Sequence, residues 1–498
     1  MQRLKNNQSA GSNGIPTELL RQQELPLTMS FTTYWQTSGL VNRSLDLYLQ
    51  DKSPGHCIPY GFDEENSGFM FQDLYEDKVA KNEPYVGIHI FNKPALLIRD
   101  LELVKKVLIK DFQYFSNRFT RMNPHNDPLG SNNLFLIRNP MWKELRQKLT
   151  PVFTSGKMKQ MFHNVDEIGL KLNEHLLSLP MDKQNGKATC KELKELCALF
   201  TTDVIASVAY GLQANSMKNP EGEFRKNGRK LFTYTVGRSI DFTAFFFLPQ
   251  IIPLVNATLF TKEASKFLFS TIGYAMEERE KSGTVRNDLI DVLLTFKKQN
   301  YPHDMIVAQA AVFFTAGYET TSSTMSFALY ELAQNQEIQK RLRNEIKEAL
   351  IKSDGKITYE LVHSLEYLGM VVQEVLRMYP PLPFLDRECA VDNPKDSYKL
   401  DDKFNPQYFP KPNTFNPERF APGNEPGIAN MPFGIGPHNC IGERFGLMQA
   451  KIGLINFLKN HYVAPNEKTQ KEMVLDPLAL IIAAKGGIYC DIVRDPLM

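Results

Sequence analysis

Apolar positions repeat at helical spacing over most of the chain that follows residue 67. Apolar residues three and four apart predict amphipathic helices, and we expect them over 101–112, 140–153, 156–179, 190–211, 221–237, 261–281, 302–336 and 367–381. Alternating patterns predict β-structure in two places, a hairpin over 85–100 around Asn92–Pro94 and strands around a turn over 475–492. The expected class is therefore mainly α with small β-sheets (α+β).

The polar segments of the chain suggest where ordered structure begins. Residues 1–67 are weakly patterned and broken by glycine and proline, so we expect them to be loosely ordered, with a short helix near Leu40–Gln50. A single domain is expected over 68–498. Within it, Ser116–Phe135 is rich in Asn, Pro and Gly and predicts a loop.

One connecting segment, 239–255, is more apolar than a connection needs to be. Its aromatic cluster has two interpretations of equal weight. It is a packed core segment, or it is the lip of a substrate channel that also touches a membrane, because exposed apolar patches mark such contacts.

Composition narrows the class of protein further. The chain has 498 residues, 42% of them hydrophobic and 23% charged, as a globular protein with a sizeable core does. Its net charge of +2 gives no reason to expect a nucleic acid partner. The six cysteines are scattered without a C-x-x-C pair, which favours free thiols in a reducing compartment. We find no signal peptide and no apolar run of roughly 18 residues that could span a bilayer.

Glycines crowd around Cys440 in the stretch Met431–Gln449, and an apolar helical pattern follows at once. Glycine serves where the backbone turns tightly or lets a ligand come close. A cysteine at a helix N-terminus meets unpaired N–H groups and the positive end of the helix dipole, which favour the thiolate. Such a sulfur suits a soft metal ion, and haem iron accepts one thiolate. A lone cysteine beside a turn is more often a small core residue.

Three helix patterns place polar residues together. Trp142 and Arg146 are four apart, and Glu374 and Arg377 are three apart, so each pair shares a face. In the longest helix, Ala316–Thr321 combines glycine, acid and hydroxyls, which can loosen the backbone ladder and open a groove. Without further context, the first pair is a core tryptophan beside a solvated arginine and the second is a surface ion pair. The Ala316–Thr321 stretch would be part of a kinked core helix. The apolar surroundings of Glu374 instead indicate a buried pair.

The cysteine stretch, Phe433-x-x-Gly436-x-x-x-Cys440-x-Gly442, resembles the haem-binding loop of the cytochrome P-450 family. Trp-x-x-x-Arg, Ala-Gly-x-Glu-Thr-Thr and Glu-x-x-Arg precede it in the family's order. The resemblance covers about residues 68–498. It implies the cytochrome P-450 fold, a triangular, helix-rich domain around a buried haem b, with iron held by the Cys440 thiolate.

The resemblance also implies roles for single residues. Haem contacts are expected from Arg118, Trp142, Arg146, Ala316, Arg387, Phe433, Gly436, His438, Cys440 and Gly442. The arginines suit haem propionates because guanidinium groups bind carboxylates in a bidentate fashion. His438 stands where the family usually has arginine, so its charge depends on pH.

The remaining roles concern chemistry and support. The resemblance implies that Glu319 and Thr320 guide protons to dioxygen, and that Glu374, Arg377 and Arg419 form a buried structural triad behind the haem. It assigns to the substrate pocket Phe313, Phe314, Leu382, Phe384, Leu480 and Ile481.

Phrases such as FTSGKMKQMF and FFTAGYETTS look most like the insect microsomal branch called family six. That branch implies oxidation of lipophilic toxins or endogenous compounds. It also implies electrons from NADPH through cytochrome P-450 reductase, with cytochrome b5 as a further donor, and the cytoplasmic face of the endoplasmic reticulum. The branch's N-terminal anchor helix is absent from the printed sequence. Either that sequence is incomplete, or the protein makes peripheral membrane contact through the apolar segment near 245.

A second departure lies between Cys389 and Tyr408. Residues 390–407 are shorter than in relatives and lack a hydrophobic strand pair, which predicts an unpaired sheet edge. Three hypotheses follow. The chain is a haem-thiolate monooxygenase acting on a lipophilic small molecule, a catalytically impaired relative with defective haem binding, or an α-rich interaction protein without haem.

Overall fold

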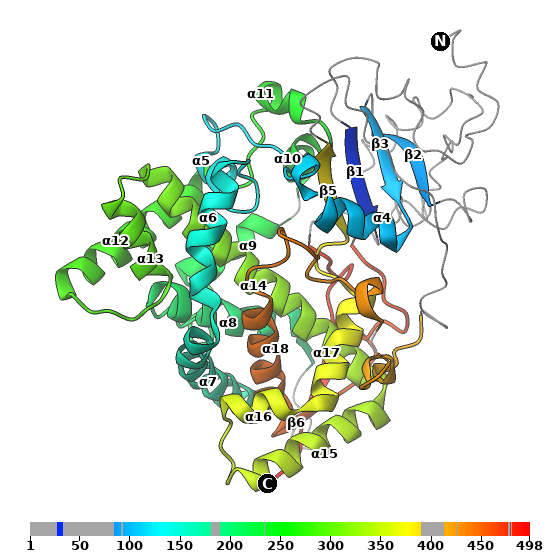
Figure 1. Cartoon of the computed structure of the whole chain (residues 1–498). Coiled ribbons are helices and arrows are strands. Elements are labelled where there is room, and N and C mark those ends of the chain that lie inside the picture. The colour runs from blue at the N-terminus through cyan, green and yellow to red at the C-terminus, as the bar shows by residue number, and fades with distance from the viewer. Residues whose placement is uncertain are drawn as a thin grey trace.

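Helices form most of the described chain, and a small sheet stands at one corner of the molecule (Figure 1). The computed structural model describes residues 27–32, 84–90, 93–180, 190–233, 235–389, 413–424, 426–476, 479 and 481–498. This arrangement confirms the expected α+β class. The expected helix near Leu40–Gln50 and the shortened stretch 390–407 lie outside the described residues.

The predicted helices are confirmed, with ends that shift by a few residues. In chain order the α-helices are α4 (Leu101–Lys105), α5 (Pro128–Asn132), α6 (Met141–Leu149), α7 (Ser155–Ser178), α8 (Leu193–Ile205), α9 (Glu223–Phe232), α10 (Val236–Phe247), α11 (Ile252–Val255), α12 (Lys262–Ser282), α13 (Leu289–Lys298), α14 (His303–Gln334), α15 (Gln336–Lys352), α16 (Tyr359–Ser364), α17 (Glu366–Met378) and α18 (Glu443–Leu458). Two short helical turns also matter for the site, the π-turn η2 (Lys106–Lys110) and the 3-10 turn η7 (Pro417–Phe420).

The larger sheet has the strand order β2-β3-β1-β5. Its strands are β1 (Leu27–Thr32), β2 (Tyr85–Ile90), β3 (Lys93–Ile98) and β5 (Phe384–Cys389). The antiparallel pair β2 and β3 confirms the predicted hairpin. One expectation was wrong: β1 comes from the segment expected to be loosely ordered, and it pairs antiparallel with β5. Because β5 is the last strand in this order, the expected unpaired sheet edge stays a prediction.

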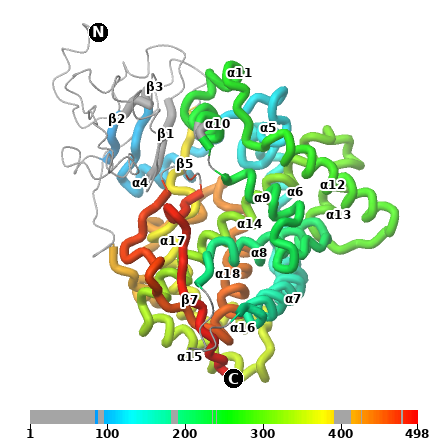
Figure 2. Tube along the Cα trace, turned by 180° about the vertical axis from the view of Figure 1, so that it is seen from behind, coloured from blue at the N-terminus to red at the C-terminus, as the bar shows by residue number. Residues whose placement is uncertain are grey.

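A second sheet, ordered β4-β7-β6, lies towards the other end of the molecule with the C-terminus (Figure 2). It contains β4 (Lys191–Glu192), β6 (His461–Ala464) and β7 (Tyr489–Arg494). The expected strands around a turn over 475–492 are confirmed in part, as β7 and an isolated bridge between Leu475 and Ala484.

Helix α14 runs through the middle of the molecule (Figure 1) and contacts α5, α8, α17 and α18. It is one continuous α-helix from His303 to Gln334. A Cβ on Gly317 would lie 2.7 Å from Cδ1 of Ile205 on α8. The glycine is therefore explained by the close approach of two helices, whereas Thr320 does bond back to the carbonyl of Ala316, at 2.7 Å.

The aromatic cluster of α10 is part of the core. Phe245, Phe246 and Phe247 are buried, and the ring of Phe246 lies 5.5 Å from that of Phe384 at the start of β5. The core interpretation therefore holds for these three residues. On the neighbouring α11, Leu254 is 81% exposed. None of the described helices is both long enough and apolar enough to cross a bilayer.

Candidate active site

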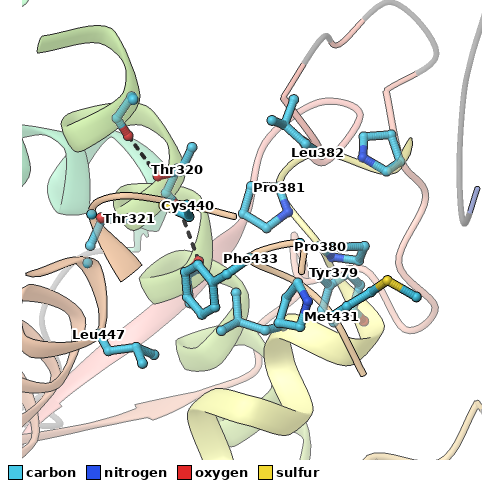
Figure 3. A pocket seen from close by; sticks show the side chains of 18 of the residues that line it. Thr320, Thr321, Tyr379, Pro380, Pro381, Leu382, Met431, Phe433, Cys440 and Leu447 are labelled. Carbon is cyan, nitrogen blue, oxygen red and sulfur yellow. Dashed lines mark hydrogen bonds between the residues drawn. The ribbon is translucent and has the colours of Figure 1, made fainter. Parts of the chain in front are cut away.

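A cavity of about 1350 Å³ lies between α14, the end of α17, the start of α18 and the stretch that precedes α18 (Figure 3). The predicted site residues that line it are Arg118, Trp142, Arg146, Phe313, Ala316, Thr320, Arg377, Leu382, Phe384, Phe433, His438, Cys440 and Gly442. Those that do not line it are Phe314, Glu319, Glu374, Arg387, Arg419, Gly436 and Ile481. Leu480 lies outside the described residues.

Residues 431–442 form a tight loop that ends at α18, here called the cysteine loop. The amide of Cys440 donates to the carbonyl of Phe433 at 2.8 Å, which closes the loop (Figure 3). Gly434 and Gly436 have φ values of +69° and +74°, a region that favours glycine. A Cβ on Gly436 would lie 2.2 Å from the carbonyl oxygen of Leu108 in η2. This glycine is needed because the loop touches a neighbouring backbone.

The side chain of Cys440 is exposed, because it opens into the cavity. Burial of the site nevertheless raises the pKa of the Cys440 thiol. The N–H of Gly442 at the start of α18 and the charge of Arg146 act in the opposite direction. The helix N-terminus thus lowers the pKa of Cys440 as expected, but burial raises it by more. Formation of the thiolate therefore depends on a bound metal cation, which deprotonates a coordinating thiol.

Three aromatic rings lie beside the cysteine loop. The rings of Trp142 and His438 are 3.7 Å apart, and Phe112 lies 5.7 Å from Trp142 and 5.3 Å from His438. Nε2 of His438 lies 2.8 Å from the carbonyl of Ser116. Burial, reinforced by nearby arginines, lowers the pKa of His438 to about 2, so the ring is neutral. It does not supply the charge that an arginine would bring.

Positive charge gathers on the same side of the cavity. Arg146 donates to the carbonyl and to Oδ1 of Asn439, at 2.8 and 2.7 Å. Arg118 donates to the carbonyl of Phe135 at 3.1 Å and approaches Asp386 at 3.3 Å. These bonds fix both guanidinium groups at the cavity wall.

Arg387 is more deeply placed than the sequence suggested. It is 1% exposed, and its Nη1 donates to the carbonyl of Asp386 at 2.7 Å. Its buried Nε has no hydrogen-bond partner within the described part of the chain. Burial, and then the charge of Arg118, lower the pKa of Arg387 to about 9. A buried arginine with an orphaned donor, next to two arginines of the cavity wall, fits a group that carries carboxylates.

Thr320 and Glu319 point in different directions. Thr320 lines the cavity from α14 (Figure 3). Ala316, four residues earlier on the same helix, lines it too. The carboxylate of Glu319 instead pairs with Nζ of Lys194, at 2.9 Å. Lys194 also donates to Oγ of Ser322 and of Ser323, both at 2.7 Å. The acid expected beside Thr320 is therefore held against α8, outside the cavity wall.

The side chains of Glu374, Arg377 and Arg419 meet at the edge of the cavity, which Arg377 lines. Glu374 is fully buried and accepts from Nε of Arg377 at 2.7 Å and from Nε of Arg419 at 3.4 Å. The amide of Asn416, next to η7, donates to the same carboxylate at 2.8 Å. The carboxylate thus joins α17 to η7.

The sequence alone did not indicate several partners in this site. Hydrogen bonds or ion pairs around the cavity are made by Lys194, Glu331, Tyr379, Asp386 and Asn439. Their partners are more than 40 residues away in the sequence, so no local pattern marks them. Only the position of Tyr379, directly before two prolines, gives a local signal.

A cavity lined by a cysteine just before a helix N-terminus, by a threonine of the central helix and by arginines is suited to a large anionic prosthetic group. The sequence model described as "Cytochrome P450" matches residues 64–490. The chain belongs to the cytochrome P450 family, whose members are haem-dependent oxidoreductases with a cysteine thiolate on the iron.

Insect proteins are among the relatives. The "Probable cytochrome P450 6g2" of Drosophila melanogaster is 49% identical, over 93% of this chain and 95% of its own. The "Probable cytochrome P450 6w1" of the same species is 42% identical, over 84% and 86%. The "Cytochrome P450 6k1" of Blattella germanica is 37% identical, over 93% of each. The expected likeness to the insect family-six branch is thereby confirmed, and the chain is a monooxygenase.

Proposed function

We propose that the domain over 68–498 binds haem b through Cys440 and oxidises a lipophilic small molecule. One observation carries the proposal: Cys440 opens into the same cavity as Thr320 on the central helix. The haem and its thiolate would supply dioxygen activation and transfer of one oxygen atom to the substrate.

The positive side of the cavity would hold the haem carboxylates. Arg118 and Arg146 line the cavity with Trp142, and Arg387 lies buried behind them. His438 would serve as a neutral ring stacked on Trp142, because its Nε2 is engaged with Ser116. Ala316, Phe433 and Gly442 supply apolar or backbone surface on which a flat macrocycle can lie. Gly436 would act indirectly, by letting the cysteine loop approach η2.

Proton delivery would centre on the hydroxyl of Thr320. Its Oγ1 donates to the carbonyl of Ala316, so the hydroxyl oxygen can still accept a proton donor from the cavity. Glu319 would contribute to proton delivery only indirectly, because its carboxylate is paired with Lys194. Glu374, Arg377 and Arg419 would support the cavity without taking part in the reaction.

The substrate would occupy the apolar part of the cavity. Phe313, Leu382 and Phe384 line that part, whereas Phe314 and Ile481 are buried behind it. This lining favours a lipophilic compound, because apolar surface removed from water stabilises the complex. Phe314 and Ile481 therefore act on the substrate only through the residues in front of them.

Electrons would come from NADPH through cytochrome P-450 reductase, with cytochrome b5 as a further donor, at the face of the cysteine loop. The family-six relatives support this assignment, and with it a place at the cytoplasmic face of the endoplasmic reticulum. The exposed Leu254 and Val255 of α11 would make peripheral contact with that membrane.

The reduced carbon monoxide spectrum tests the proposal. Purified protein should hold haem stoichiometrically and show the thiolate-type band, and Cys440→Ser should lose that band. Cys389→Ser is the matched control, since this buried cysteine does not line the cavity. Wild-type protein that lacks the band would overturn the proposal, and a low haem content would favour the catalytically impaired alternative.

A further inference from the structure

One end of the cavity lies away from the larger sheet and is lined by apolar side chains. These come from α7, α8, α13 and α14 and from the π-turn η5 (Ala206–Tyr210), which continues α8. Figures 1 and 2 both show α7, α8 and α13 on the side of the molecule away from β5, whereas Phe384, at the start of β5, lines the part assigned to the substrate. We call this end the η5 chamber, and its six residues are Met161, Ile205, Val208, Ala209, Leu289 and Val312.

The π-turn η5 is at the centre of the chamber wall. It contacts α7, α8, α13 and α14, and its residues Val208 and Ala209 are each 5% exposed. The hydroxyl of Tyr210 donates to the carbonyl of Ala310 at 2.6 Å, which ties η5 to α14. Single π-turns interrupt α-helices frequently at functional sites. The wall is therefore held in place, and its irregular turn calls for a functional explanation.

The chemistry of the chamber selects what can occupy it. None of its six side chains carries an N–H or O–H group, and the sulfur of Met161 is only a weak acceptor. A buried water molecule needs several polar partners, so cavities with such a lining stay dry and bind apolar molecules such as xenon. Dioxygen is also small and apolar, and it is a substrate of every monooxygenase. The chamber therefore suits the gas better than it suits water.

One face of α14 leads from the chamber to Thr320. Val312, Ala316 and Thr320 follow one another at a spacing of four residues, so they share a helix face, and all three line the cavity. Next to Val312, the ring of Phe313 is stacked on that of Phe153, with centroids 5.4 Å apart. Both rings also line the cavity. The chamber is thus continuous with the proposed reaction site along the central helix.

We propose that the η5 chamber holds dioxygen and supplies it along α14 to the site beside Thr320. This inference rests on the proposed function, in which dioxygen is activated beside that residue. No bond forms or breaks in the chamber, because the gas enters only by partition into an apolar space. The stacked rings of Phe153 and Phe313 restrict the passage of bulky compounds. Dioxygen therefore has a place that the lipophilic substrate does not occupy.

Xenon tests the chamber directly, because it is an apolar atom that binds dry cavities. In a xenon NMR titration the wild-type protein should show a saturable site. Ala209→Leu fills the chamber and should weaken that site at least about fourfold, the equivalent of one methylene group of apolar contact. Val208→Ile, which adds a single methyl group, should weaken it in the same direction.

Val204→Ile is the matched control for the xenon titration. It makes the same addition one helical turn earlier on α8, at a buried residue that does not line the cavity, so it should bind xenon as the wild type does. A wild-type protein without a saturable site would overturn the proposal. Equal xenon affinity in the wild type and Ala209→Leu, or an equal loss in Val204→Ile and Val208→Ile, would overturn it too.

Carbon monoxide tests the supply of gas in the haem-loaded protein. After flash photolysis of the reduced carbon monoxide complex, recombination from solution should slow about fourfold in Ala209→Leu and stay near the wild-type rate in Val204→Ile. The affinity of 4-phenylimidazole, which is too large for the chamber, should change by less than about twofold in both variants. An unchanged rate in Ala209→Leu would overturn the proposal. So would an equal loss for the gas and the azole, which would indicate a general disturbance of the cavity.

The two proposals fail in distinguishable ways. If the wild-type protein shows no thiolate-type band, the proposed function fails while the xenon titration still reports on the chamber. If the band is intact but neither xenon affinity nor carbon monoxide recombination responds to Ala209→Leu, only the role of the η5 chamber fails.

Discussion

The cysteine loop contains two glycines at which substitution by alanine would distinguish the cost of backbone strain from the cost of a steric clash. Gly434 and Gly436 have similar φ values, +69° and +74°. A Cβ on Gly434 would meet its nearest atoms at 3.8 Å, in ordinary contact. A Cβ on Gly436 would lie 2.2 Å from the carbonyl oxygen of Leu108, a backbone atom that cannot rotate away. Alanine at the two positions therefore differs mainly in that one collision.

The expected losses follow from these distances. Alanine in the left-handed region costs about 1–2 kcal/mol at either position. At Gly436 the loop or η2 must also move by roughly 1 Å, and such overpacking costs about 1–3 kcal/mol more. We expect the free energy of unfolding to fall by about 1–2 kcal/mol for Gly434→Ala and by about 2–5 kcal/mol for Gly436→Ala.

Urea unfolding followed by tryptophan fluorescence measures this difference, because Trp142 lies beside the loop. The haem content of the purified variants gives a second reading, and only Gly436→Ala should lose haem, since the displaced loop carries Cys440. Equal losses of stability in the two variants would refute the reasoning, because the contact with Leu108 would then contribute nothing.

Three further predictions concern buried charge. Burial, and then Arg494, lower the pKa of His461 to about 4 from its ordinary 6.5. The folded state thus resists protonation, and the stability present above pH 6.5 is lost as the pH falls towards 4. The loss is at most about 3 kcal/mol. Between pH 7 and pH 5, the urea midpoint of His461→Phe should therefore fall less than that of the wild type. Glu374→Gln removes the fully buried carboxylate that two arginines share, whose side chains are 10% and 11% exposed, and should cost about 3–5 kcal/mol of unfolding free energy. A loss below about 1 kcal/mol, as expected of an exposed pair, would contradict a buried ion pair. Lys194→Met removes the partner of Glu319 and should lower stability by about 1–3 kcal/mol. If Glu319 takes part in proton delivery, the same change also lowers the ratio of product formed to NADPH consumed; an unchanged ratio would show that the ion pair is structural only.

Local patterns in the sequence were sufficient for the helices that we predicted, for the β2–β3 hairpin and for part of the cavity lining. They were not sufficient for α10, because 239–255 was expected to be a connecting segment. Helical spacing over 302–336 predicted α14, because a proline-free run of apolar positions has few alternatives. The motif around Cys440 predicted a loop before a helix, since glycines at fixed positions restrict the backbone to few conformations. In both cases the information lies within a few neighbouring residues.

Contacts between distant segments were not predictable in this way. The sequence suggested that Glu319 faces the reaction site, but Lys194, 125 residues earlier, holds it against α8. It suggested that the glycine of α14 loosens a helix, whereas the side chain of Ile205 explains it. Electrostatic partners and steric limits depend on which surfaces meet, and one chain does not show that before it folds.

The sequence by itself determined the class of protein, the ligand loop and the helix that faces it, because these depend on short motifs and on periodicity. The tertiary structure alone decided where β1 pairs, that burial outweighs the helix effect on the pKa of Cys440, and that Tyr379 pairs with Glu331 and Asp386 with the amide of Phe119. The physical reason is that burial and hydrogen bonding between remote segments arise only when the chain is packed.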